Sequence, residues 1–92
     1  MQECIEKGVD YVGNDLKQVK TSSADMCACR CKEYDGCRFF SWHSDGSQVA
    51  ETCFLKSSDR DRIIREDYVY VGSRDCCTGD YYNHTESFEA NN

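Results

Sequence analysis

Eight cysteines among 92 residues constrain the fold of this chain more than any other feature. So small a domain gains limited stability from its core alone, and this cysteine density is typical of domains that disulfides reinforce. Disulfides form and persist in oxidising compartments. We therefore expect a secreted or extracellular module.

The chain begins without a signal peptide and contains no apolar run long enough to cross a bilayer. We therefore expect no direct membrane insertion, and we expect the segment to be excised from a longer precursor. The sequence contains no proline, so no Pro-rich linker marks an internal boundary. The expected organisation is one folded domain over residues 1–77 and a polar tail or inter-domain linker over residues 78–92.

One helix is expected inside the stretch from Ser22 to Lys56, which holds five of the eight cysteines. Ser22 or Ser23 can cap its first turn, because a serine hydroxyl accepts an otherwise unpaired backbone N–H. Gly36 suits the left-handed residue that ends many helices. These signals predict a helix over about residues 23–34, along which apolar residues recur at helical spacing: Ala24, Cys27, Ala28, Cys31 and Tyr34.

The cysteines of this helix fall on two sides. Cys27 and Cys31 are four residues apart and share the buried face, whereas Cys29 points to the other side. Structural zinc sites prefer two cysteine pairs with C-x₂₋₄-C spacing, and three alternating thiolates on a helix cannot point at one ion. We therefore expect no metal and no cofactor.

The pattern after the helix changes to that of strands. The aromatic run Cys37–His43, the segment Thr52–Lys56 and the alternating segment Asp67–Gly72 suit an antiparallel sheet. Cys4–Gly8 begins a further strand-like segment. The segment Asp59–Glu66 mixes three arginines with acids and is interpreted as a solvated loop. The expected fold class is α+β.

The net charge of -6, with 17 acidic against 11 basic residues, excludes several kinds of partner. Binding to a nucleic acid depends on Lys and Arg side chains that neutralise phosphates, so we expect no nucleic-acid partner. The same deficit of basic residues argues against heparin-like polyanions.

No residue pattern indicates catalysis. His43 and His84 are the only histidines, and neither lies in a Cys/His or Ser/His/Asp arrangement. The chain is therefore expected not to be an enzyme. Asn83 begins the motif Asn-His-Thr and is a candidate for N-glycosylation.

Three groups of residues form a recognisable pattern: Gly13-x-Asp15-Leu16, Ser22-Ser23-Ala24-Asp25-x-Cys27-x₃-Cys31-x₅-Cys37-x₂-Phe40-x-Trp42 and Cys53-x-Leu55-Lys56-Ser57. Together they resemble a PAN/apple domain over about Cys4 to Cys76. The resemblance implies a small disulfide-rich fold in which an antiparallel β-sheet of about five strands curls around one α-helix.

The resemblance also implies three disulfides: Cys31 with Cys37, Cys27 with Cys53, and Cys4 with Cys76 or Cys77. Cys29 and one of the last two cysteines are surplus to this six-cysteine pattern. An even cysteine count and the direction of Cys29 favour a fourth bridge, Cys29–Cys77, which leaves Cys76 for Cys4. The alternative is a free or intermolecular thiol at Cys29.

Among PAN/apple domains, the chain most resembles the apple repeats of microneme adhesins from apicomplexan parasites. This implies an extracellular adhesion module, stored in the microneme secretory organelle and used in host-cell attachment and invasion. The implied partners are a host-cell surface protein or glycan and other adhesin subunits. Two alternatives stay open, a galactose-type lectin domain and a structural spacer in a multi-apple array. Four residues have the chemistry of a sugar site: Lys7, Tyr11, Lys56 and Tyr68.

Overall fold

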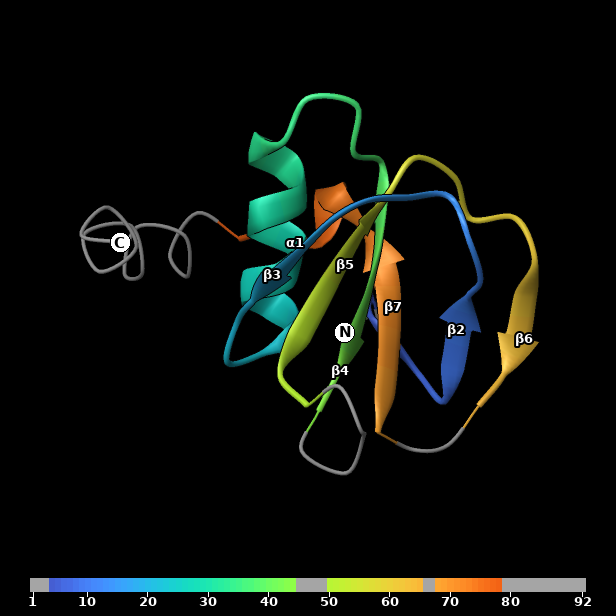
Figure 1. The fold of residues 1–92 in the computed structure, drawn as a ribbon. Helices are drawn as coiled ribbons and strands as arrows, with labels where there is room; N and C mark the ends of the chain where they lie inside the picture. Colours follow the sequence, from blue (N-terminus) through green and yellow to red (C-terminus); the bar gives the residue numbers. More distant parts are fainter. Residues whose placement is uncertain (1–3, 45–49, 66–67, 79–92) are drawn as a thin grey trace.

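The computed structural model describes residues 4–44, 50–65 and 68–78 (Figure 1). These residues form one α-helix, seven short strands and a single 3₁₀ turn. In chain order the elements are β1 (Glu6–Lys7), β2 (Val9–Tyr11), β3 (Asp15–Lys20), α1 (Ala24–Glu33), β4 (Phe39–His43), β5 (Thr52–Lys56), β6 (Arg62–Ile64), β7 (Val69–Ser73) and the 3₁₀ turn η1 (Arg74–Cys76).

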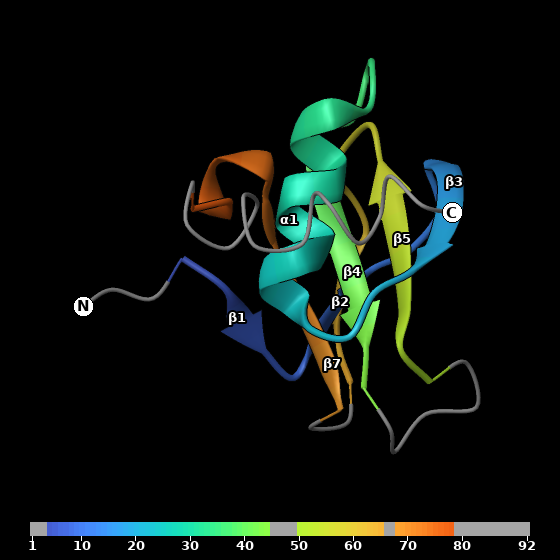
Figure 2. The ribbon, with the colours of Figure 1, turned by 90° about the vertical axis from the view of Figure 1, so that its left-hand side faces the viewer.

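Five of the strands form an antiparallel sheet in the order β1-β7-β4-β5-β3. In the central strand β4, Phe40 lies opposite Leu55 of β5 on one side and Gly72 of β7 on the other. The helix α1 packs along one face of this sheet, against β4, β5 and β7 (Figures 1 and 2). The expected antiparallel sheet of about five strands around one helix is therefore confirmed.

Side-chain alternation along β4 divides the interior into two clusters, because successive residues of a strand point to opposite faces. Phe40 and Trp42 point toward α1 and join the main core, where Cys27 and Leu55 are at most 1% exposed. Phe39 points the other way and packs against β2 and β7. The sheet is thus covered on both faces, by α1 to its left and by β2 to its right in Figure 1, and β6 lies on the far side of β2.

The strand β6 corrects the interpretation of residues 59–66 as a loop. It pairs antiparallel with β2 in a separate two-stranded sheet. All three of its side chains are exposed, so its sequence lacks the apolar alternation that marks a half-buried strand. Backbone hydrogen bonds hold it in place, and they continue beyond the strand from Arg65 N to Gly8 O at 2.8 Å.

The helix α1 begins one residue after the expected start and ends one residue before the expected end. Ser23 is the N-cap, because its hydroxyl accepts a hydrogen bond from Met26 N at 3.2 Å, so the alternative with Ser22 as the cap is wrong. Tyr34, expected as the last residue of the apolar stripe, is the C-cap of the helix and is 37% exposed. Gly36 follows with a left-handed φ of 89°.

The structure contains four disulfides: Cys4–Cys76, Cys27–Cys53, Cys29–Cys77 and Cys31–Cys37. The first three join segments that are distant in sequence, whereas Cys31–Cys37 spans 6 positions. The expected pairs and the pairs in the structure are the same four. Cys29 lies on the side of α1 that contacts η1, and its bond to Cys77 leaves it only 1% exposed.

Residues 79–92 lie outside the described residues, and with them the glycosylation candidate Asn83. The expected boundary between a domain at 1–77 and a tail or linker stays a prediction. Within residues 4–44, 50–65 and 68–78, no helix is long and apolar enough to cross a membrane. The same residues contain no group of three or more His, Cys, Asp or Glu placed to hold a metal ion.

Candidate functional site

A small polar groove lies on the face of the sheet opposite α1, beside β2. We call it the Lys56 groove. Its volume is about 210 Å³. Pockets for drug-sized ligands measure about 300–1,000 Å³, so this groove suits a single sugar ring or a single side chain. Its lining residues are Asp10, Tyr11, Val12, Gly13, Asp15, His43, Phe54, Lys56 and Arg65.

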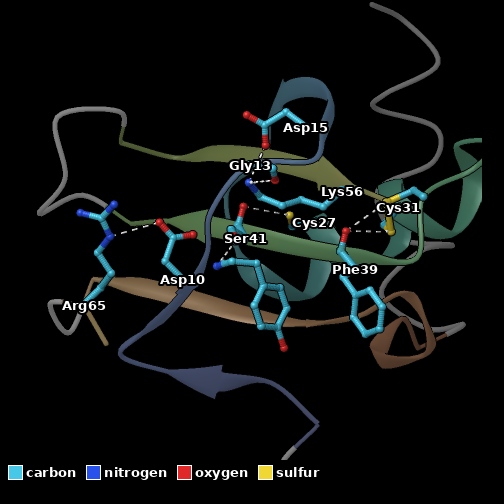
Figure 3. A network of polar contacts seen from close by, with 11 residues as sticks. Asp10, Gly13, Asp15, Cys27, Cys31, Phe39, Ser41, Lys56 and Arg65 are labelled. Atoms are coloured by element: carbon cyan, nitrogen blue, oxygen red, sulfur yellow. Dashed lines mark hydrogen bonds and ion pairs between the residues drawn. A yellow bond between two sulfur atoms is a disulfide. The ribbon is translucent and has the colours of Figure 1, made fainter. Parts of the chain in front are cut away.

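Lys56 is the most buried charged residue of the groove, with 4% of its surface exposed. Leu55 points toward α1, so Phe54 and Lys56 point to the opposite face. A buried ammonium group needs partners to offset its lost hydration. Lys56 Nζ donates hydrogen bonds to Gly13 O at 3.0 Å and to Asp15 Oδ1 at 2.5 Å (Figure 3). The same atom lies 5.6 Å from the ring centroid of Phe54, within the range of a cation–π contact.

The turn between β2 and β3 supplies the carbonyl that Lys56 needs. Gly13 and Asn14 both have a left-handed backbone, with φ values of 81° and 60°. Glycine adopts this conformation without steric cost, and asparagine adopts it more readily than most other residues. The Gly-Asn sequence therefore allows the turn to fold back over the end of β5.

An ion pair between Asp10 and Arg65 forms another part of the lining. Arg65 Nε lies 3.2 Å from Asp10 Oδ2 (Figure 3). Only 10% of the Asp10 side chain is exposed, compared with 47% of the Arg65 side chain. Asp10 belongs to β2, and Arg65 directly follows β6. The pairing of β2 with β6 therefore brings together two residues that are far apart in the sequence.

His43 ends β4 and contacts Phe54 edge to face, with the ring centroids 5.1 Å apart. Burial lowers the pKa of His43 below its ordinary value of 6.5. The negative charge of Asp10 opposes this shift, whereas the positive charges of Arg65 and Lys56 add to it. His43 is therefore mainly neutral at pH 7.

Tyr11 lines the groove but exposes only 8% of its surface. Its ring packs edge to face on Phe39 with the centroids 5.8 Å apart, and its backbone N–H donates to Ser41 Oγ at 3.4 Å. Burial raises the pKa of the Tyr11 hydroxyl, and the nearby carboxylate of Asp59 raises it further. Tyr11 thus supports the groove more than it offers a free aromatic face.

The charges of the groove balance. Each of its two cations, Lys56 and Arg65, is paired with one carboxylate, from Asp15 and Asp10 respectively. The partly exposed Asp15 and Arg65 side chains still offer hydrogen-bond acceptors and donors to a ligand. Such a site suits an uncharged polar group, such as a hydroxyl or an amide, better than a free anion or cation.

Two of the four residues expected at a sugar site, Tyr11 and Lys56, line this groove. Lys7 lies on the edge strand β1, where its Nζ is 5.8 Å from the ring centroid of Tyr70. Tyr68 precedes β7 and does not line the groove. The structure thus brings together only half of the expected set, and a role in ligand binding stays a prediction for all four residues.

Sequence reasoning missed several residues of the groove: Asp10, Asp15, His43, Phe54 and Arg65. Strand alternation carried a partial signal, because Phe54 and Lys56 must share one face of β5. For Arg65 no signal was available, since its position depends on a strand that was interpreted as a loop.

A second concavity of about 500 Å³ opens beside the start of α1. Its lining combines Trp42 and Tyr70 with Ile5 and two disulfide-bonded cysteines. Among the described residues of this lining, Asp25 is the only charged one. The Lys56 groove concentrates more polar groups in a smaller space and is therefore the better candidate for specific recognition.

The fold defines a small module that four disulfides hold together. A model of the PAN domain family matches residues 4–83, and the chain belongs to this family. PAN domains act as adhesion and interaction modules rather than as enzymes.

A solved structure with a similar fold is the solution structure of a PAN module from Eimeria tenella. It is 23% identical in sequence, and the match covers 83% of this chain and 84% of that chain with a TM-score of 0.57. This likeness shows a shared fold. The comparison with curated proteins gave no match.

Proposed function

We propose that this chain is an extracellular adhesion module that binds a host-cell surface protein through the Lys56 groove. The single observation that carries this proposal is the groove itself, a concave site with balanced charges and with partly exposed donors and acceptors on Arg65 and Asp15. Membership of the PAN family and the oxidised cysteines support an extracellular setting.

Apolar residues beside the groove favour a protein partner over a sugar. Val12 lines the groove and is 40% exposed, while Ile63 and Ile64 of the neighbouring strand β6 are 39% and 80% exposed. Exposed apolar residues close to polar groups are typical of protein interfaces, whose centres are apolar and whose rims are polar. A protein partner would cover these residues and place one polar side chain in the groove.

The galactose-type lectin alternative rests on the chemistry of the groove. Sugar hydroxyls need both donors and acceptors, and Arg65, Lys56 and the two carboxylates supply both. The volume of about 210 Å³ suits one ring. In this alternative the exposed isoleucines of β6 have no role.

The resemblance to apple repeats of microneme adhesins extends the proposal to a biological setting. In that setting the protein is secreted from micronemes during host-cell attachment and invasion, and other adhesin subunits are further partners. The shared fold of a PAN module from Eimeria tenella, an apicomplexan, supports this setting. A structural spacer repeat in a multi-apple array is the remaining alternative.

Binding of the labelled, oxidised full chain to cultured vertebrate epithelial cells tests the proposal. We expect saturable binding that is lost when the cells are treated with protease and that is unchanged by excess galactose. Competition by galactose but not by glucose would replace the protein partner with a sugar. Absence of saturable binding would overturn the proposal and favour the spacer.

A further inference from the structure

The disulfide Cys4–Cys76 joins the two ends of the described fold. Its cysteines are separated by 72 positions in sequence, yet their Cα atoms lie 5.5 Å apart. Cys4 is separated from β1 by Ile5 alone, and Cys76 ends η1. Figure 2 shows β1 and η1 on the same side of α1. The chain therefore enters and leaves the fold at one covalently closed point.

This connectivity has a mechanical consequence. A force applied to the two ends of the chain follows the shortest covalent path, which runs through Cys4, the disulfide and Cys76. Residues 5–75 form a closed loop beside that path. The sheet and the helix then carry no load.

We propose a further function that goes beyond ligand binding: the module transmits tension between the segments that flank it while its fold stays unloaded. The groove then keeps its shape when an attached cell pulls on the protein. A module without such a bond would stretch its strands apart under the same load and lose the site.

The disulfide Cys29–Cys77 provides a second closure of the same kind. It lies one residue beyond the first on the C-terminal side, spans 48 positions and holds its Cα atoms 4.5 Å apart. If the first bond is opened, the load passes from Cys4 along the chain to Cys29, and from there directly to Cys77. Only residues 4–29 are then exposed to the force, while β4, β5, β6 and β7 stay protected.

Single-molecule stretching of the full chain, with handles at residues 1 and 92, tests this function. The oxidised protein should show no unfolding step at forces below those that break covalent bonds. The variant Cys4→Ser/Cys76→Ser should lengthen by at most about 85 Å, because an extended chain spans about 3.4 Å per residue. The additional changes Cys29→Ser/Cys77→Ser should raise the increase in length to about 160 Å, because the load then passes through the disulfide Cys27–Cys53.

The variant Cys31→Ser/Cys37→Ser is the matched control, because the disulfide that it removes lies wholly inside the loop of residues 5–75. Under force this variant should lengthen no more than the unchanged protein does. The unchanged protein with dithiothreitol provides a test that needs no variant to fold: it should lengthen only after reductant is added, by up to about 250 Å. A lengthening step of more than about 65 Å without reductant, longer than residues 1–3 and 77–92 outside the Cys4–Cys76 loop can give together, would overturn the proposal. This outcome is independent of ligand binding, so the two proposals fail separately.

Discussion

Lys56 shows how one buried charge can organise a site. Its ammonium group is held by the Gly13 carbonyl and the Asp15 carboxylate, which belong to the turn and strand after β2. The same contacts fix the position of that turn over the end of β5. The groove therefore depends on this lysine for its shape as well as for its charge.

Lys56→Met is expected to lower the free energy of unfolding by about 1–3 kcal/mol, because the hydrogen bonds from the buried ammonium group to Gly13 O and Asp15 Oδ1 would be lost. Urea unfolding of the oxidised protein measures the change. Lys17→Met, at an exposed position of β3, should alter stability by less than about 0.5 kcal/mol. Equal stability of the Lys56 variant and the unchanged protein would contradict this account of the groove.

His43 should make stability depend on pH. Its pKa is lowered in the folded protein, so the unfolded chain binds more protons just below pH 6.5. The stabilisation that comes from neutral His43 is complete above pH 6.5 and is lost as the pH falls through the lowered folded pKa. The free energy of unfolding should therefore fall between pH 7.5 and pH 5, and it should fall less in His43→Gln. Parallel pH profiles for the two proteins would show that His43 has no such effect.

At the scale of elements, the sequence was most informative where local signals determine structure. The helix α1 was predictable because a cap, a periodic apolar stripe and a glycine stop agree. The central strands β4 and β5 were predictable from their aromatic and apolar residues. The strand β6 was not, because its exposed side chains carry no periodic pattern and only its pairing with β2 makes it a strand. Since β6 positions Arg65, the place of Arg65 in the groove could not be predicted either.

Ser23→Ala is expected to destabilise the protein by about 1 kcal/mol, because the Met26 N–H would lose its acceptor at the start of α1. Ser22→Ala should cost less than about 0.5 kcal/mol, since its hydroxyl caps no backbone group. Thermal or urea unfolding of both variants gives the comparison. A larger loss of stability in Ser22→Ala than in Ser23→Ala would show that Ser22, not Ser23, caps the helix.

At the scale of the whole molecule, the disulfides connect α1 to the sheet and close the chain ends. The resemblance to the family implied three of the disulfides, and the even number of cysteines together with the direction of Cys29 suggested the fourth. The resemblance could not give the Lys56 groove, because its residues come from four strands and two connecting segments that only the folded chain brings together.

Peptide mapping of the non-reduced protein should recover the four pairs of the structure and no free thiol. Removing the fourth bridge in Cys29→Ser/Cys77→Ser should lower stability by about 2–4 kcal/mol, because the unfolded chain gains freedom. Two free thiols, or a covalent dimer through Cys29, would be inconsistent with the Cys29–Cys77 bond.

The affinities of two matched variants for epithelial cells show whether the Lys56 groove is the binding site. Arg65→Gln changes an exposed groove residue while keeping a hydrogen-bond donor, and Arg60→Gln makes the same change outside the groove lining. We expect Arg65→Gln to weaken binding at least about tenfold, equivalent to about 1.4 kcal/mol, and Arg60→Gln to bind within about twofold of the unchanged protein. Equal binding by both variants would show that the Lys56 groove is not the binding site.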